Sequence, residues 1–318
     1  MNLITAEKGE SVVTNVSLLK KNVLRIVVTD GTTEITLALL YRILSDNTFG
    51  HLITLFRGPG VTYGHDESVA FKDADVVFCI GSAREYVFRE EEYNGPFFKE
   101  YVRVAKFYGE CIEKYAKKDA RIIVLGNTAA TIISRYAKSI PPKNITALAM
   151  FNLKMAATHI AERANCLPID VKNIVIWGNN NCYSFPDCRY VYFANGKPVS
   201  DELIVWMRTS LQSIMRKVAN RPRYIRSMAC GLADHCKFLW NGTPENEWTC
   251  MGVLSDHSYD IRAGIFFSYP VFCKNGEYEI VKGLVADEYV RRYILDLSRL
   301  IFRDVAAAIS VCNRQWNN

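Results

Sequence analysis

The chain has 318 residues, of which 49% are hydrophobic and 23% are charged, and its formal net charge is +6. This composition is typical of a globular protein and excludes a largely disordered chain. The basic residues are mixed with acidic ones and the sequence has no apolar run of about 18 residues, so we expect neither a nucleic-acid nor a membrane partner. The first residues lack the long apolar stretch of a secretory signal, which makes a cytoplasmic location the expectation.

The first half of the chain alternates short apolar runs with amphipathic helical patterns. After an N-terminal tail expected over residues 1–22, strand-like runs occupy 23–30, 51–56, 74–81 and 120–127, and helical patterns occupy 34–44 and 97–118. Val- and Ile-rich strands separated by helices indicate a parallel sheet covered on both faces. Residues 23–147 are therefore predicted to form a doubly wound α/β domain. Its ligand edge would carry the loops that begin at Asp30, Phe56, Gly81 and Gly126.

The second half has a different pattern, which predicts an α+β domain over residues 148–318. Helices are expected at about 152–165, 202–240 and 287–311, and strands at 171–178, 248–254 and 264–281. Asn275 and Gly276 interrupt the last strand-like run, and Asn-Gly between two such runs is a strong hairpin signal. We expect this domain to complete a cleft against the first one.

A row of asparagines follows the strand in "VIWGNNNCYSFPD", residues 175–187. A loop after a strand is a favoured place for catalytic side chains, yet an amide neither takes nor gives a proton near neutral pH. The alternative interpretation is a polar loop that needs hydrogen bonds from side chains to backbone.

The ten cysteines include no C-x-x-C pair. Buried reduced thiols are therefore the expectation, and no metal is predicted. Cys182 and Cys188, near Asp187, give the zinc alternative its only local support, and they lack neighbouring histidines.

Five stretches in order point to a family: "VAFKDADVVFCIGSAR", "CIEKYAKKDARIIVLGN", "SIPPKNITALAMFNLKMAATHIA", "DVKNIVIWGNNNCYSFPD" and "WNGTPENEWTCMGVLSD". Together they resemble the cytosolic-type malate dehydrogenases, over nearly the whole chain from Val23. The resemblance implies a Rossmann domain over 23–147, followed by the lactate and malate dehydrogenase C-terminal domain over 148–318, usually in a dimer.

The family passes a hydride from malate to NAD while a histidine, oriented by an aspartate, accepts the hydroxyl proton. The resemblance puts Asn180 at the histidine position and Asn152 at the aspartate position. It also puts Met155 where the family has a substrate-binding arginine. Arg84 and Arg89 have the spacing of the two arginines on the family's substrate loop, although they can equally be solvated side chains in a glutamate-rich loop.

The cofactor positions implied by the resemblance are degenerate. Asp30, Thr33 and Thr36 stand where the family has glycines, and Gly31 lies in a shifted position. Backbone near Gly31 and the hydroxyls of Thr32 and Thr33 could still hold an anion. Phe56 and Arg57 replace the acid that binds the adenosine ribose, and Arg57 gives a weak signal for NADP. Asn127 matches a family residue near the nicotinamide.

The resemblance therefore predicts a malate-dehydrogenase-like protein without catalysis, with no NAD(P) cofactor or a weakly bound one. Its partners would be a small dicarboxylate, a nucleotide or a protein, as a homodimer or a pair with an active paralogue. The short segment from Arg57 to Gly60 replaces a helix that contributes to the family's dimer contact. The alternative is a divergent NAD(P)-dependent oxidoreductase acting on malate, oxaloacetate or a related 2-hydroxy acid, with His159, His235 or His257 as a new base.

Overall fold

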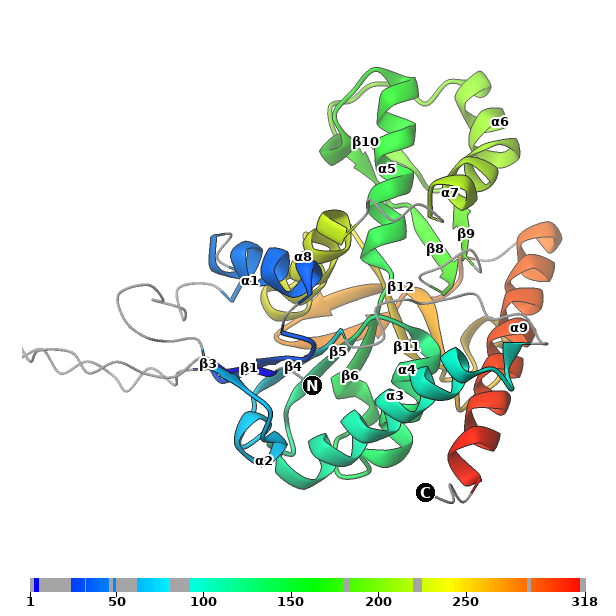
Figure 1. Cartoon of the computed structure of the whole chain (residues 1–318). Helices are drawn as coiled ribbons and strands as arrows, with labels where there is room; N and C mark the ends of the chain where they lie inside the picture. Colours follow the sequence, from blue (N-terminus) through cyan, green and yellow to red (C-terminus); the bar gives the residue numbers. More distant parts are fainter. Residues whose placement is uncertain are drawn as a thin grey trace, which may run out of the picture.

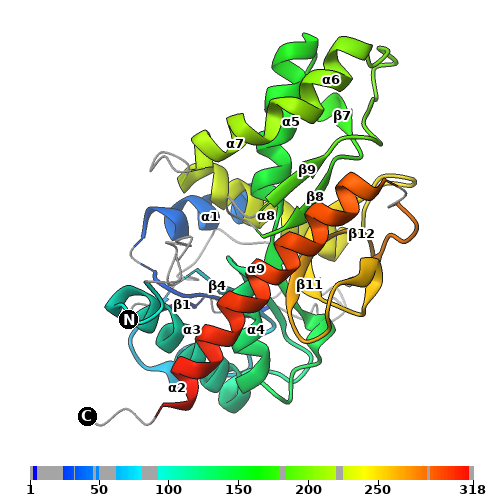
Figure 2. The same cartoon turned by 90° about the vertical axis from the view of Figure 1, so that its right-hand side faces the viewer.

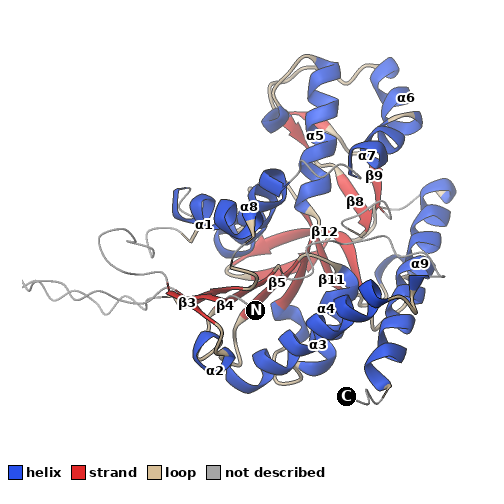
Figure 3. Cartoon of the chain, viewed as in Figure 1, coloured by secondary structure: helices blue, strands red, loops and turns tan. Residues whose placement is uncertain are grey.

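One mixed β-sheet with helices on both faces forms the centre of the molecule (Figures 1 and 3). This computed structural model describes residues 3–5, 24–31, 33–45, 48–49, 62–80, 92–179, 184–219, 225–284 and 287–314. Within these residues, no helix combines the length and the apolar character needed to cross a membrane.

The first half contributes the parallel part of the sheet. The strands β2 (Ile26–Val28), β4 (Val76–Cys79), β5 (Arg121–Val124) and β6 (Ile145–Leu148) are neighbours in this order, and each pair is parallel. Nearly all of their residues are buried, as their continuous apolar runs require when both faces of a sheet are covered. The predicted α/β class of the fold is confirmed.

The N-terminal end of the chain differs from the expected tail, because residues 3–5 form a strand. This strand, β1 (Leu3–Thr5), lies between β2 and β3 (Thr62–Gly64) and is antiparallel to both. The free edge of β2 offers unpaired backbone groups that a short extended segment can satisfy, whatever its side chains. The strand predicted over 51–56 lies outside the described residues.

Helices cover the two faces of this part of the sheet (Figure 1). One face is covered by α1 (Glu34–Ser45) and α8 (Ile225–Asn241), and the other by α2 (Glu67–Ala70), α3 (Pro96–Tyr115) and α4 (Asn127–Tyr136). The helices α3 and α4 approach each other closely at Gly109, where a β-carbon would come within 2.8 Å of the β-carbon of Tyr136.

The second half extends the same sheet. Strand β6 pairs antiparallel with β11 (Thr249–Leu254), and the sheet continues through β12 (Phe266–Lys274), β8 (Val175–Gly178) and β9 (Ser184–Asp187). Strand β13 (Glu277–Ile280) forms a hairpin with β12. Asn275 and Gly276 both have positive φ, 55° and 78°, as the predicted hairpin turn requires.

The remaining elements form a lobe above the sheet and a long C-terminal helix. The lobe contains α5 (Met150–Ala164), α6 (Asp201–Thr209), α7 (Leu211–Ala219) and the strand pair β7 (Val171–Lys172) and β10 (Tyr192–Phe193). Figure 2 shows α9 (Glu288–Asn313) running along the side of the molecule past α4 and β8. Short 3-10 turns lie at Pro142–Asn144, Pro168–Asp170 and Ser258–Asp260. The single long helical stretch predicted over 202–240 is wrong, because it divides into α6, α7 and α8.

The hydrophobic core crosses the predicted boundary at residue 147. One cluster joins Ile26 and Leu39 of the first half to Leu148 and Leu232 of the second. A second cluster packs α3 and α4 against the sheet and the end of α9. The division into two domains therefore stays a sequence prediction, and the two halves share both a sheet and a core.

Candidate functional site

Six of the predicted site residues lie outside the described part of the chain: Thr32, Phe56, Arg57, Arg84, Arg89 and Asn180. The described ones fall into two groups. Asp30, Gly31, Thr33 and Thr36 form the turn after β2, whereas Asn127, Asn152 and Met155 lie where α4 and α5 begin, next to the end of β8.

Several described groups of the turn after β2 bond to one another. Asp30 adopts a left-handed conformation with φ of 55°, and its carbonyl accepts hydrogen bonds from Thr33 N at 3.0 Å and Thr36 Oγ1 at 2.8 Å. Thr36 is fully buried, and its backbone N–H donates to Thr33 Oγ1 at 3.4 Å. The hydroxyl of Thr33 therefore occupies one backbone donor in the first turn of α1, that of Thr36.

This turn does not fit a dinucleotide pyrophosphate. Such a group needs free backbone N–H groups at a helix N-terminus and glycines that let it approach closely. Here Thr33 N and Thr36 N are occupied by Asp30 and Thr33, and the half-buried Asp30 adds a carboxylate to the same turn.

Asn127, at the first position of α4, faces the protein interior. Its Nδ2 donates to the carbonyl of Gly178 at 2.7 Å, and its backbone N–H donates to Asn179 Oδ1 at 3.4 Å. Its carbonyl oxygen accepts from Thr131 Oγ1 at 2.8 Å, and that hydroxyl also accepts from Phe266 N at 3.2 Å. Asn127 thus joins α4 to β8 and, through Thr131, to β12.

Asn152, in the first turn of α5, is buried and bonds to Asn179, which directly follows β8, and to Ser184, the first residue of β9. Its Nδ2 donates to the carbonyl of Asn179 at 3.3 Å and to Ser184 Oγ at 3.0 Å. The start of β9 is held further, because Gln212 Nε2 of α7 donates to the carbonyl of Ser184 at 3.1 Å.

The amides of Asn127, Asn152 and Asn179 therefore form a network, which we call the asparagine network. It links the starts of α4 and α5 to the end of β8. Each bond joins an amide to a backbone group or a second side chain, and none of the three residues can transfer a proton near neutral pH. The network can position the backbone that leads into residue 180, but it offers no acid or base.

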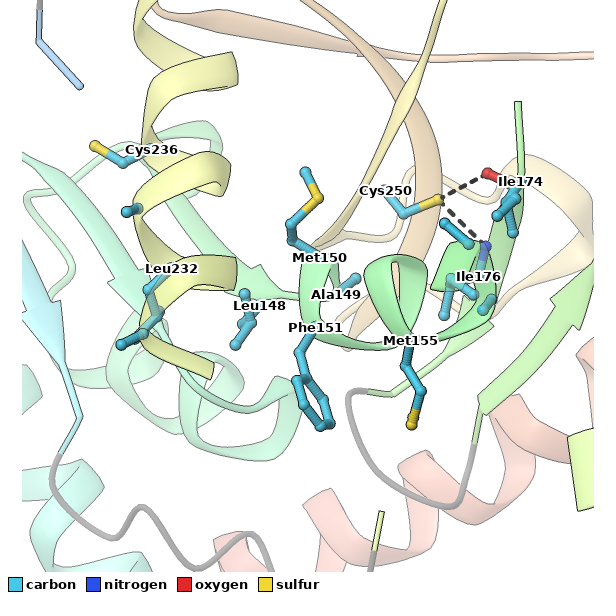
Figure 4. Close-up of a cluster of buried hydrophobic side chains, with 14 of the residues drawn as sticks. Leu148, Ala149, Met150, Phe151, Met155, Ile174, Ile176, Leu232, Cys236 and Cys250 are labelled. Atoms are coloured by element: carbon cyan, nitrogen blue, oxygen red, sulfur yellow. Dashed lines mark hydrogen bonds between the residues drawn. The ribbon is translucent and has the colours of Figure 1, made fainter. Parts of the chain in front are cut away.

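Met155 lies in the hydrophobic cluster between α5 and its neighbours. Figure 4 shows it projecting from α5 on the same side as Phe151, and both belong to one cluster of buried hydrophobic residues. It is 8% exposed. A thioether in this position contributes packing and has no charge for a carboxylate.

The three alternative bases lie in different environments. His235 of α8 is completely buried, its Nε2 lies 2.8 Å from Thr146 Oγ1, and burial lowers its pKa to about 3. His159 is half-buried on α5 beside Glu162, with 3.8 Å between Nδ1 and Oε2. His257 is exposed in a left-handed conformation after β11. Neither the hydrogen bond of His235 with Thr146 nor the contact of His159 with Glu162 involves a residue of the asparagine network.

The described cysteines are all unpaired. Burial raises the pKa of the Cys250 thiol to about 12 and of the Cys111 thiol to about 12, so both are protonated near neutral pH. Among the described residues, no group of three or more His, Cys, Asp or Glu is placed to hold a metal ion. Cys182, one half of the zinc alternative, lies outside them.

The sequence-based reasoning missed two features near the site. Asn179 was not singled out, although its position directly before Asn180 in the asparagine row was a signal. Asp187 was noted only as a zinc neighbour, whereas it is a buried carboxylate bonded by Arg189 through Nε at 2.9 Å and Nη2 at 2.8 Å. Trp177 Nε1 donates to the same carboxylate at 3.3 Å.

Solved structures of the same fold are those of lactate and malate dehydrogenases. Malate dehydrogenase from Naegleria fowleri superposes with a TM-score of 0.69 at 23% identity, covering 78% of each chain. Lactate dehydrogenase from Trichomonas vaginalis in complex with NADH and oxamate superposes with a TM-score of 0.62 at 22% identity, again over 78% of each chain. The chain thus has the lactate and malate dehydrogenase fold.

Sequence relatives identify the family, whereas the solved structures identify only the fold. The chain is 31% identical to the cytoplasmic malate dehydrogenase of Rattus norvegicus, over 84% of this chain and 92% of that protein. It is 35% identical to a malate dehydrogenase of Nicotiana tabacum, over 66% of this chain and 67% of that protein. No protein-family model matches the sequence. The chain belongs to the malate dehydrogenase family.

Proposed function

We propose that this protein is a member of the malate dehydrogenase family that has lost hydride transfer and acts by binding a metabolite or a protein partner. The observation that carries the proposal is Asn152, whose amide donates to the carbonyl of Asn179 and to Ser184. An aspartate that orients a histidine supplies a negative charge that balances the imidazolium, whereas the Asn152 amide is neutral and its Nδ2 already donates to two acceptors. With Asn180 at the histidine position, both parts of the proton relay are replaced.

Loss of the relay is a large effect. Removal of a general base alone typically costs about 100- to 10,000-fold in rate. The cofactor site adds to this loss, because the turn after β2 uses its own backbone donors and carries Asp30. We therefore expect NAD(P) to bind weakly or not at all.

The substrate side supports binding of a small dicarboxylate only weakly. Met155 is packed in apolar surroundings and cannot form the bidentate contact that an arginine makes with a carboxylate. Arg84 and Arg89 remain as the proposed anion-binding residues. A protein partner is the other possibility, either a second copy of the chain or an active paralogue, with a changed interface where Arg57 to Gly60 shortens the chain. The names of its relatives support a cytoplasmic location.

The second candidate function is a divergent NAD(P)-dependent oxidoreductase that uses another base. His159 is the nearest histidine in sequence to Asn152, and it lies seven residues along α5, which is about 10 Å along the helix axis. That separation and the pairing of His159 with Glu162 favour a structural role. His159→Ala with unchanged reduction of oxaloacetate would exclude it as the base.

The test is a fluorescence titration of the protein with NADH, followed by addition of oxaloacetate. We expect no consumption of NADH, and either weak binding or none up to millimolar concentration. Measurable turnover by the natural chain would overturn the proposal. The matched variant is the pair Asn152→Asp and Asn180→His, checked for folding by its melting curve, which tests whether the missing relay alone explains the lack of activity.

A further inference from the structure

A buried group of ionisable side chains joins α9 to the turn that precedes α3. Tyr93 lies in this turn and its hydroxyl donates a hydrogen bond to Asp304 Oδ1 of α9. Arg303 Nε donates to the same hydroxyl at 3.1 Å, and its guanidinium lies 5.9 Å from the centre of the Tyr93 ring. Asp304 is 6% exposed.

We propose that Asp304, Tyr93 and Arg303 form a proton-responsive joint, in which the charge on the Asp304 carboxyl sets how firmly the start of α3 is held against α9. The proposal does not depend on the proposed function. It depends on a carboxyl that is buried, on a phenol that bonds to it across two elements 211 positions apart in the chain, and on one cation beside them.

The charges that face the carboxyl are few among the described residues. Arg303 from α9 and Tyr93 from the turn before α3 are the groups that act on Asp304. Lys106 and Glu110 of α3 and Arg135 of α4 act instead on Cys312, two turns further along α9. Burial is the largest influence on the Asp304 carboxyl and raises its pKa to about 6, against the opposing effects of Tyr93 and Arg303.

The direction of the response follows from proton linkage. The closed joint holds the proton of Asp304 more tightly than an open, solvated joint, in which the carboxyl has its ordinary pKa of 3.8. Protonation therefore favours the closed joint, and its contribution is lost as the pH rises through about 6. Above that pH a buried negative charge penalises the closed state.

The joint contacts the candidate site through aromatic side chains. The ring of Tyr93 lies 4.9 Å from that of Phe98, and Phe98 stacks on Tyr101 at 6.4 Å between ring centres. The hydroxyl of Tyr101 accepts a hydrogen bond from Ala129 N at 3.0 Å, two residues after Asn127 in the first turn of α4. A change in the position of the start of α3 thus acts on a helix that carries part of the asparagine network.

The first test is the titration of the carboxyl itself. Protein labelled with ¹³C at the aspartate carboxyls would be followed between pH 4 and 8, with Asp304→Asn used to assign the signal. We expect a midpoint near 6. A midpoint below about 5 would overturn the proposal, because the carboxyl would then have no unusual proton affinity.

The second test measures the joint by hydrogen exchange of the amides at 95–102. Asp304→Asn keeps the acceptor for Tyr93 and is always neutral, so it serves as the pH-independent reference. Relative to this variant, the protection of the natural chain should fall about tenfold between pH 5 and pH 7.5, because the carboxyl of the open joint is already ionised over this range while that of the closed joint loses its proton near pH 6. A ratio of protection that is the same at both pH values would refute the joint.

Two further variants make the result specific. Asp296→Asn changes an exposed aspartate two turns earlier on α9, where it pairs with Arg299, and should leave the exchange at 95–102 unchanged at both pH values. Tyr93→Phe keeps the ring against Phe98 and removes the phenol, so it should raise the titration midpoint of Asp304 and lower the protection of 95–102 at pH 5. An unchanged midpoint in Tyr93→Phe would contradict the proposed hydrogen bond.

Discussion

The side-chain oxygen of Asn127 lies directly against the α-carbon of Gly252. A β-carbon at Gly252 would come within 2.2 Å of Asn127 Oδ1 and within 2.7 Å of the β-carbon of Ala147. Helix α4 therefore contacts β11 at a distance that only a glycine permits, at the point where β11 pairs with β6 through Gly252 and Ala147.

We predict that Gly252→Ala destabilises the protein strongly. Neither neighbour is the end of a long side chain that can move away, so the cost should lie at the upper end of overpacking effects, about 3 kcal/mol. The free energy of unfolding in urea measures it. Gly64→Ala, where a β-carbon would meet nothing within 4 Å, is the control and should be nearly neutral. Similar stabilities of the two variants would contradict the contact.

Asn152→Asp tests the asparagine network. A carboxylate at this position cannot donate to the carbonyl of Asn179, and the two oxygens would repel each other across a buried contact. We expect a loss of about 1–3 kcal/mol at pH 7, smaller at pH 4 where the acid can be protonated. Asn246→Asp, at an exposed residue with φ of 61°, is the matched control. If Asn152→Asp is as stable as that control, then the network does not hold the loop.

The contribution of the Asp187–Arg189 ion pair to stability is predicted to depend on the burial of the Asp187 carboxylate. Asp187→Asn puts a neutral amide in the buried position and leaves the exposed Arg189 guanidinium without its bidentate partner, and it should cost about 1–3 kcal/mol in unfolding free energy. Asp260→Asn breaks an exposed pair in which Arg291 Nε and Nη2 both donate to Asp260 Oδ2, and it should cost less than about 1 kcal/mol. Denaturant unfolding of both variants gives the comparison, and equal costs would show that the Asp187 carboxylate is accessible to water.

His235 is predicted to make the protein sensitive to acid. The folded chain keeps this imidazole neutral down to about pH 3, whereas the unfolded chain binds a proton below the ordinary value of 6.5. Stability from this group is therefore complete above pH 6.5 and falls by about 1.4 kcal/mol per pH unit as the pH drops towards 3. The measurement is unfolding free energy from pH 7 to 4.

The variant for this prediction removes both partners of the buried hydrogen bond. His235→Leu combined with Thr146→Val removes the titrating imidazole and leaves neither hydrogen-bond partner unsatisfied. The slope of unfolding free energy against pH should therefore decrease by the contribution of one proton, about 1.4 kcal/mol per pH unit. An unchanged slope in the double variant would show that His235 is not the group that titrates.

Local patterns predicted most of the fold. The periodicity of α1, α3 and α5, the apolar runs of β2, β4 and β5, and the Asn275–Gly276 turn each depend on residues close in sequence. The division of 202–240 was missed because only Ser210 separates α6 from α7. The hydrophobic periodicity of the two helices therefore looks continuous in the sequence. Strand β1 was missed because backbone pairing, rather than side-chain pattern, places Leu3–Thr5 in the sheet.

The candidate site was less predictable for a physical reason. The replacements at Asn152 and Met155 could be found by resemblance, but their new contacts depend on residues 27 or more positions away, such as Asn179 and Ser184. The direction in which the Asn127 amide points, towards Gly178 rather than towards a ligand, is set by the packing of α4 on β11 and β8. Sequence spacing has no information on such an orientation.

The pairing of β6 with β11 has a consequence for how the molecule unfolds. A boundary crossed by backbone hydrogen bonds, by a shared apolar cluster and by the contacts of Asn127 cannot open without breaking all three at once. The two halves should then behave as one cooperative unit, with a single heat-absorption peak whose calorimetric and van't Hoff enthalpies agree. A ligand that binds to either half would raise the melting temperature of the whole chain.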